Sequence, residues 1–273
     1  MVVYKRLIRN RVSFTEDTDD ILIVQPRYIY AFDIGLECLQ NGATAPTLSE
    51  IAGIIDKMQV KLSGKIVTEV SGADLLALNC LYLGKEPLYL VPANDNELGY
   101  ISGLRLPISL PAGEHVLSVR FTYGSAATRD TEKLTLATVE YETAIEEGHI
   151  EIPSYAYTPP STGSFNTALS STFHGAVEGF LIYSTTIPTA TSDVATVREV
   201  RIKVEGDIKY EGTIHDIRAD APYPADSTLR SITDNYLFLD FSKAPIEPGA
   251  KVELEIKSDD TNAVRILPII RVR

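Results

Sequence analysis

MQVKLSG at residues 58–64 and VRIKVEG at residues 200–206 are two related stretches that lie 142 residues apart. In each, apolar residues alternate with polar ones and a glycine follows, which is typical of a half-buried β-strand that ends in a tight turn. The match continues beyond the glycine without a gap, because Ile66 corresponds to Ile208. This correspondence predicts that one β unit has been duplicated within the chain.

The correspondence extends into the following segments. A capping box, Ser71-x-x-Asp74, is matched by Thr213-x-x-Asp216, and each precedes a short apolar run typical of a brief helix. A further capping box, Thr47-x-x-Glu50, predicts another short helix or turn. With a gap of several residues, three later strands also correspond: residues 104–106 to 237–239, 111–121 to 248–256 and 134–141 to 264–272.

Alternation with a period of two recurs through much of the chain. Residues 28–38 place aromatic and aliphatic side chains on one face and Asp33 and Glu37 on the other. Turn sequences such as Asn41-Gly42 and Pro248-Gly249 separate the runs. Short strands at this spacing indicate an all-β chain of sandwiches or barrels.

Composition excludes several classes of protein. The chain has 273 residues, a formal net charge of -12 and a pI of about 4.8, so its general surface is unsuited to wrapping nucleic acid. Cys38 and Cys80 lie in apolar segments and are expected to be buried thiols rather than a disulfide. The first residues lack the apolar stretch of a signal peptide, and no apolar run is long enough to span a membrane. We therefore expect folding in a reducing cytoplasm.

The domain boundaries follow from the duplication and from a change in composition. Residues 146–172 contain Pro153, Pro159-Pro160 and Gly163 and show no periodicity. We predict an N-terminal domain at residues 1–145 with a basic N-terminal arm, a linker at 146–172 and a C-terminal domain at 173–273.

Residues that could carry catalysis are not arranged in any recognised motif. The sequence contains none of the metalloprotease, nucleophile-elbow, dinucleotide-binding or phosphate-binding patterns, so we predict that the protein is not an enzyme and needs no cofactor. A weak Ca²⁺ candidate is the polar segment that contains Asn94, Asp95 and Glu97, which offers hard oxygen donors but lacks the spacing of a defined calcium loop. The alternative is a plain turn.

The N-terminus is basic although the chain as a whole is acidic. Lys5, Arg6, Arg9 and Arg11 occur before the first acidic residue, and a cluster of acids follows. One interpretation is an arm that faces membrane head groups or a genome. The other is a first strand whose charges pair with acids elsewhere on the protein.

The stretch at residues 58–64, followed by SGADLLALN at 71–79, resembles the middle of the first barrel in double jelly-roll major capsid proteins of tailless icosahedral viruses. Residues 200–207 resemble the equivalent strand of the second barrel, and the likeness is to the compact, corticovirus-like type. The resemblance implies two tandem antiparallel eight-stranded jelly rolls with one short helix each.

The same resemblance implies a function and a set of partners. Such a protein forms trimeric, pseudo-hexameric capsomers that tile an icosahedral shell, commonly over an inner membrane. Its partners would be two further copies of itself, neighbouring capsomers, penton and minor capsid proteins, and the inner membrane or genome through the N-terminus. Its location would be the virion capsid, assembled in the host cytoplasm.

The sequence is also compatible with two other classes of β protein. A minor capsid or spike protein would show the same strand pattern, because copy number is not written in a sequence. A carbohydrate-binding sandwich would stack sugars on aromatic side chains, commonly Trp, but the chain has 14 Tyr and no Trp. Tyr155 and Tyr157 in the expected linker are the residues that could serve such a site.

Overall fold

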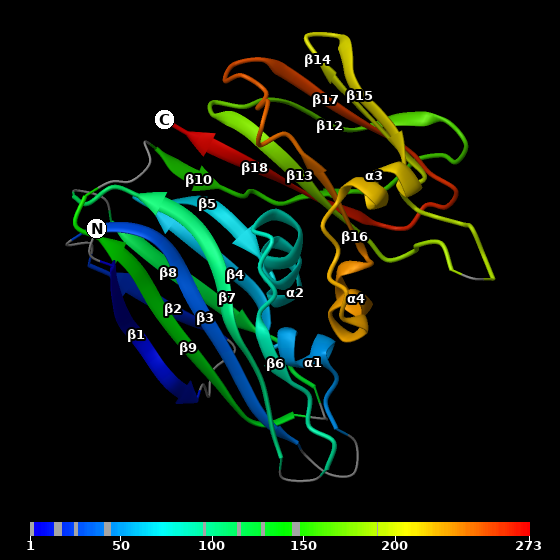
Figure 1. Ribbon diagram of the computed structural model, residues 1–273. Coiled ribbons are helices and arrows are strands. Elements are labelled where there is room, and N and C mark those ends of the chain that lie inside the picture. Colours follow the sequence, from blue (N-terminus) through cyan, green and yellow to red (C-terminus); the bar gives the residue numbers. More distant parts are fainter. Residues whose placement is uncertain are drawn as a thin grey trace. The chain divides into compact units, whose positions relative to one another are not determined.

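The computed structural model describes residues 3–13, 18–24, 27–40, 45–94, 97–113, 116–126, 129–143, 148–189 and 191–273. The chain forms two compact units, Met1–Ile150 and Glu151–Arg273 (Figure 1). Both are built mainly of antiparallel strands, and short helices connect some of them.

The first unit contains two antiparallel sheets and three short helical segments. One sheet has the order β1-β9-β3-β7-β6 and the other has the order β2-β8-β4-β5. The strands are β1 (Val3–Ser13), β2 (Thr18–Ile23), β3 (Tyr28–Gln40), β4 (Ile55–Leu62), β5 (Lys65–Val70), β6 (Leu88–Leu90), β7 (Leu98–Leu110), β8 (Leu117–Tyr123) and β9 (Arg129–Tyr141). The helices are α1 (Leu48–Ala52), α2 (Gly72–Ala77) and the π-helical turn η1 (Leu78–Tyr82).

The second unit repeats this plan. Its sheets have the orders β10-β18-β13-β16, with β11 also paired to β18, and β12-β17-β14-β15. The strands are β10 (His149–Glu151), β11 (Tyr155–Tyr157), β12 (Phe165–Thr172), β13 (Ala176–Ser184), β14 (Glu199–Val204), β15 (Asp207–Thr213), β16 (Tyr236–Asp240), β17 (Lys251–Lys257) and β18 (Val264–Val272). Its helices are α3 (Ile214–Asp220) and α4 (Ser227–Thr233).

The two units share one strand topology once the short strands β6 and β11 are set aside. In each, the first, last, third and sixth strands form one sheet, and the second, seventh, fourth and fifth form the other. This is the eight-stranded jelly roll. The expected fold class, two tandem antiparallel jelly rolls, is therefore confirmed.

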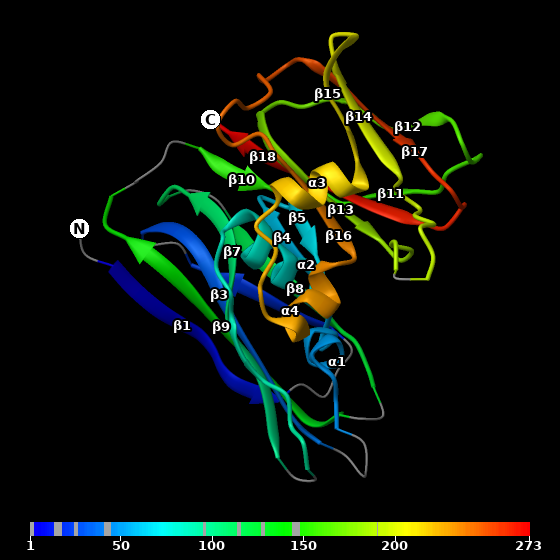
Figure 2. The same ribbon diagram turned by 45° about the vertical axis from the view of Figure 1, so that its right-hand side comes forward.

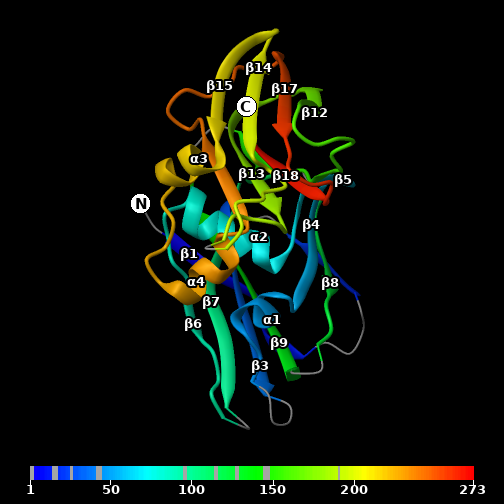
Figure 3. The same cartoon turned by 90° about the vertical axis from the view of Figure 1, so that its right-hand side faces the viewer.

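The predicted duplication is visible residue by residue in the hairpins β4–β5 and β14–β15. Gly64 and Gly206 occupy the two turns with φ of 86° and 89°, a left-handed conformation that glycine adopts without strain. The same bulge interrupts both hairpins, directly after Val60 in β4 and directly after Ile202 in β14. Figure 3 shows the β14–β15 hairpin beside β17, with α3 following it.

The capping boxes also form as the sequence predicts. The side chains of Ser71 and Thr213 accept hydrogen bonds from the N3 backbone of α2 and α3, and the N3 carboxylates bond back to the cap residues. The estimate of one helix in each unit was too low, because α1 and α4 also form. The α1 helix starts at the capping box of Thr47, whereas α4 is capped by Asp226 alone.

The prediction that residues 146–172 form a linker is wrong for the part of this range that the structure describes. Residues 149–151, 155–157 and 165–172 form β10, β11 and β12, which pair with the sheets of the second unit. Tyr155 and Tyr157 are partly buried and pack against the core of that unit. Prolines between these short strands interrupt the alternation, which explains why the sequence showed no periodicity there.

Each unit has its own hydrophobic core between its two sheets. In the first unit, Phe32, Val60 and Phe121 are fully buried, and they come from β3, β4 and β8. In the second, Phe180, Ile202 and Leu254 occupy the corresponding interior. Burial of each such side chain contributes about 1.5–3 kcal/mol, so alternation in these strands accounts for the inward faces of both jelly rolls.

The helices of the first unit close one end of its core. The α1 and α2 helices pack on each other, and both contact β7 (Figure 2). Gly72 opens α2 at this contact, where a Cβ atom would lie 1.9 Å from the carbonyl oxygen of Ala52. The absence of a side chain at Gly72 thus allows the two helices to meet.

We expect Gly72→Ala to lower the free energy of unfolding by about 3 kcal/mol, the upper part of the range for overpacking, because the overlap is with a backbone atom. Urea denaturation followed by circular dichroism measures this. Gly84→Ala is the control: its φ is +59°, but a Cβ there meets nothing within 4 Å, so only about 1–2 kcal/mol should be lost. Equal losses for the two variants would contradict the steric explanation.

Candidate interface surfaces

The four basic residues expected in an arm lie on β1, the edge strand of the five-stranded sheet. Of the two interpretations of this segment, the structure supports the first strand rather than the arm. Register shifts after Leu7 and after Arg9 break the alternation of β1 and conceal the strand. Each basic side chain forms an ion pair within its own unit: Lys5 with Asp33 at 3.1 Å, Arg6 with Glu140 at 2.6 Å, Arg9 with Asp19 at 3.4 Å and Arg11 with Glu37 at 2.8 Å.

The pair of Arg6 and Glu140 is structural. Glu140 is fully buried, and its Oε1 accepts hydrogen bonds from Arg6 Nε and from Thr138 Oγ1, both at 2.6 Å. Arg6 Nη2 also donates to the carbonyl oxygen of Val24 at 2.6 Å. A buried carboxylate requires such partners, because an unpaired charge in the interior is strongly destabilising.

A hollow of about 160 Å³ lies on the five-stranded sheet of the first unit. Small residues leave space in it, and polar side chains surround them. Its lining includes Lys5, Asp33, Gly35, Glu37, Tyr100 and Ala137. Sequence alternation had already placed Asp33 and Glu37 on one face. The sequence allowed pairing of a first strand with acids, but it did not identify Asp33 and Glu37 as the partners.

Asp33 is the most strongly engaged carboxylate of the hollow. It accepts hydrogen bonds from Arg105 Nε at 2.8 Å and Nη2 at 3.2 Å, in addition to its ion pair with Lys5. Burial alone would raise the pKa of this carboxyl, but the bonds from Arg105 and Lys5 outweigh burial, and the pKa lies below its usual range. Asp33 is therefore ionised at neutral pH.

The second unit carries a ladder of alternating charges on the sheet β12-β17-β14-β15. Arg201 pairs with Glu211 at 2.6 Å and lies 3.9 Å from the centre of the Phe165 ring. Further pairs are Arg201–Glu255 at 3.3 Å, Lys203–Glu255 at 2.6 Å, Lys251–Glu253 at 2.6 Å and Lys257–Glu199 at 2.6 Å. Except for Lys251–Glu253, which lies within β17, these pairs join neighbouring strands, and opposite charges there favour this register.

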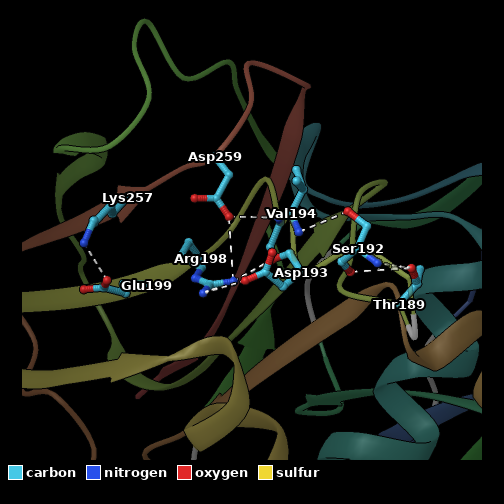
Figure 4. A network of polar contacts seen from close by, with 9 residues as sticks. Thr189, Ser192, Asp193, Val194, Arg198, Glu199, Lys257 and Asp259 are labelled. Carbon is cyan, nitrogen blue, oxygen red and sulfur yellow. Dashed lines mark hydrogen bonds and ion pairs between the residues drawn. The ribbon is translucent and has the colours of Figure 1, made fainter.

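Figure 4 shows how the ladder continues into the loops at one end of β14. Arg198 Nη1 donates to the carbonyl oxygen of Asp193 at 2.6 Å, and it lies 3.8 Å from the carboxylate of Asp259. Asp259 in turn accepts a hydrogen bond from the backbone of Ala195 at 3.1 Å. Because these charges are satisfied within the unit, this surface can approach another protein surface with little uncompensated charge.

The exposed apolar side chains include two isoleucines. Ile66 on β5 is 45% exposed and Ile208 on β15 is 55% exposed, and they are equivalent residues of the duplication. Both strands are at the edges of their sheets. An edge strand also presents unpaired backbone donors and acceptors that another chain can bind.

The structure describes Asn94 and Glu97 of the calcium candidate, whereas Asp95 lies outside the described residues. Glu97 Oε2 accepts hydrogen bonds from the backbone of Ala93 and Asn94 at 2.9 and 3.0 Å, and Oε1 accepts one from Asn94 Nδ2 at 2.7 Å. The bond from Asn94 and those from the backbone lower the pKa of Glu97. A Ca²⁺ ion that bound Glu97 would compete with these donors. Calcium binding at this segment stays a prediction. Within the described ranges, no group of three or more His, Cys, Asp and Glu could hold a metal ion.

The cysteines behave as the sequence predicts. Cys38 and Cys80 are buried and free. Burial raises the pKa of Cys38 to about 11 and that of Cys80 to about 12, so both are neutral thiols at physiological pH. In the part of the chain that the structure describes, no helix has the length and apolar character of a membrane span.

Comparison with known proteins gives matches by structure and not by sequence. No family model and no curated protein matches the chain. The major capsid protein (MCP) of STIV, Sulfolobus turreted icosahedral virus, is similar with a TM-score of 0.74 and 14% identity, over 100% of this chain and 97% of that one. The major capsid protein P2 of bacteriophage PM2 is similar with a TM-score of 0.62 and 12% identity, over 98% of this chain and 96% of that one. A chain of the PBCV-1 virus capsid is similar with a TM-score of 0.58 and 10% identity, over 98% of this chain and 93% of that one.

These similarities extend over nearly the whole length of both chains in each comparison. Together with the identical strand order of the two units, they show that the chain has the double jelly-roll fold of viral major capsid proteins.

Proposed function

We propose that the protein is a structural subunit of an icosahedral viral capsid and has no catalytic role. The observation that carries this proposal is the similarity to the STIV capsid protein, which covers 100% of this chain and 97% of that one. Fold alone does not define function. Here, however, the described surfaces offer satisfied charge ladders and exposed edge residues, which suit contacts between subunits.

The proposed assembly is a trimer that acts as a pseudo-hexameric capsomer, because three copies of two jelly rolls present six similar units. Neighbouring capsomers and penton and minor capsid proteins would surround it in the virion shell, and assembly would take place in the host cytoplasm. The net charge of -12 makes copies of the chain repel one another, so this arrangement needs specific contacts that outweigh the repulsion.

An inner membrane or genome beneath the shell is a separate part of the proposal. It rests on the basic residues Lys5, Arg6, Arg9 and Arg11 of β1. Their ion pairs reduce the positive charge available to lipid or nucleic acid, so any such contact would depend mainly on the more exposed side chains of Lys5 and Arg11.

Analytical ultracentrifugation and negative-stain microscopy of the purified protein test the assembly. A subunit of 30.0 kDa should sediment as a trimer of about three times that mass, with interfaces that bury about 2,000 Å² or more in total, and should give hexagonal particles. A monomer at every concentration would contradict the capsomer proposal. Monomers that bind immobilised glycans would instead favour a carbohydrate-binding protein.

A further inference from the structure

The outward faces of the two equivalent four-stranded sheets can be compared row by row, because residues paired across strands share one face of a sheet. In the first unit, one row across β2, β8, β4 and β5 consists of Leu22, Ser118, Lys61 and Ile66. The equivalent row across β12, β17, β14 and β15 consists of Ser170, Glu253, Lys203 and Ile208. The last two positions agree, whereas the edge strand has leucine in the first unit and serine in the second.

The difference continues at the end of the same strands. Val24 directly follows β2, and Val116 directly precedes β8, beyond the paired residues Ile23 and Leu117. The residues at the equivalent positions of the second unit, which pair with each other, are Thr172 and Lys251. A backbone hydrogen bond confirms the equivalence, because Ser63 N donates to the carbonyl oxygen of Val116 at 2.8 Å and Glu205 N donates to that of Lys251 at 3.0 Å.

The first unit thus carries an aliphatic patch, defined as Leu22, Val24 and Val116, whose residues are 69%, 72% and 60% exposed. The fold does not require these side chains, since the second unit has the same strand pairing with Ser170, Thr172 and Lys251 in their places. Single exposed apolar residues are ordinary, but neighbouring ones mark contact sites. The duplication therefore serves as an internal control, and it indicates a binding role for the patch.

Charges of both signs border the aliphatic patch. Asp20 and Arg120 are opposite each other in the next row of β2 and β8. Asp20 lies 3.8 Å from Arg120 and 3.9 Å from Lys61, close to the limit for an ion pair, and the side chains of Asp20 and Arg120 are both well exposed. Each of these two side chains can therefore take a further partner from another molecule.

A surface of this kind is complementary to itself. When two copies meet about a two-fold axis, residue i of one contacts residue j of the other and the reverse also holds. Asp20 of each copy can then pair with Arg120 of the other, while the aliphatic side chains cover one another. Such a balanced border matters because the net charge of -12 makes the copies repel elsewhere.

The second unit offers less apolar surface as a partner. Among its described residues, the large hydrophobic side chains that are exposed are Val194 and Ile208. The first unit of a second copy, in contrast, brings another aliphatic patch. Apolar burial therefore favours contact between first units.

We propose that the aliphatic patch binds the same patch of a second copy about a two-fold axis, with Asp20 and Arg120 paired reciprocally at its border. The inference rests on the proposed function and names one contact within the shell. Copies within a three-fold trimer are not related by a two-fold axis, so the contact joins two neighbouring capsomers.

Exchange of the patch for its counterpart in the second unit tests the contact. The triple variant Leu22→Ser, Val24→Thr and Val116→Lys carries the side chains that the second unit has at these positions, so the sheet should still fold. We expect it to weaken association between trimers by about tenfold or more. Sedimentation velocity over a range of concentrations measures association, and thermal unfolding followed by circular dichroism verifies the fold.

A matched variant separates the apolar contact from sequence change in general. The triple variant Leu22→Met, Val24→Ile and Val116→Ile keeps the patch aliphatic and should associate as the wild type does. Loss of association in the polar variant cannot come from greater repulsion, because Val116→Lys makes the acidic chain less negative.

Cross-linking tests the two-fold symmetry directly. Leu22→Cys and Val24→Cys each place one exposed thiol in the patch, whereas Cys38 and Cys80 are buried. With a short bismaleimide, at least one of these variants should give dimers linked through the same residue of two copies. Ser170→Cys, the equivalent exposed position in the second unit, should give none.

The outcomes separate this inference from the proposed function. Loss of assemblies larger than the trimer, with trimers intact, supports the inference. Normal assembly of the polar variant, dissociation of its trimers, or no cross-link at either cysteine would overturn the inference alone. If the polar variant assembles normally but no longer binds phosphatidylglycerol vesicles that the wild type binds, lipid covers the patch and the inference is wrong. A wild type that is monomeric at every concentration contradicts both the inference and the capsid proposal.

Discussion

Replacing Arg129 with methionine is expected to lower the free energy of unfolding by about 3–5 kcal/mol, the range for a buried ion pair that loses one partner. The Arg129 side chain is 1% exposed, and its Nε lies 2.6 Å from Glu132. Its other nitrogens donate to the carbonyl oxygens of Glu50 at 2.6 Å and Gly124 at 2.8 Å. One guanidinium thus joins β9 to α1 and to the loop after β8.

Urea denaturation of the variant measures this loss. Arg120→Met is the surface control, because the Arg120 side chain is 41% exposed and lies 3.8 Å from Asp20, so that it should cost no more than about 1 kcal/mol. Adding Glu132→Gln to Arg129→Met should recover part of the loss by removing the unpaired carboxylate. Similar values for Arg129→Met and Arg120→Met would show that the buried network contributes little.

Deletion of residues 1–13 is expected to prevent the first unit from folding. The deletion removes β1, exposes the edge of β9 and leaves the fully buried Glu140 without Arg6. An unpaired buried charge alone costs about 3–5 kcal/mol, which is a large part of the total stability of a domain. Limited proteolysis and the dispersion of NMR amide signals report whether the unit folds.

Point variants on the same strand provide the control for this deletion. Lys5→Gln and Arg11→Gln remove cations whose side chains are 61% and 55% exposed, and each should cost no more than about 1 kcal/mol. Arg6→Gln should be clearly worse than either. A truncated protein with wild-type stability would support a free N-terminal arm and contradict the role of β1.

The sequence by itself determined the features that depend on neighbouring residues. Alternation set the inward faces of β4 and β14, because successive side chains of a strand point to opposite sides. Gly64 and Gly206 marked two turns that need a left-handed backbone, and Ser71 and Thr213 marked helix starts through bonds to residues three positions later. The duplication was readable because both halves retain these local signals at one constant spacing.

Only the tertiary structure decided which distant residues meet. The sequence left open whether residues 3–13 form a strand or an arm, because the bulges of β1 break the alternation and its partner β9 lies far along the chain. Arg6 and Glu140 are separated by 134 residues, so no local pattern links them. The short strands β10 and β11 likewise become strands by pairing with β18. Their backbone hydrogen bonds and buried charges are satisfied by long-range partners, and that information is not contained in any local stretch of the sequence.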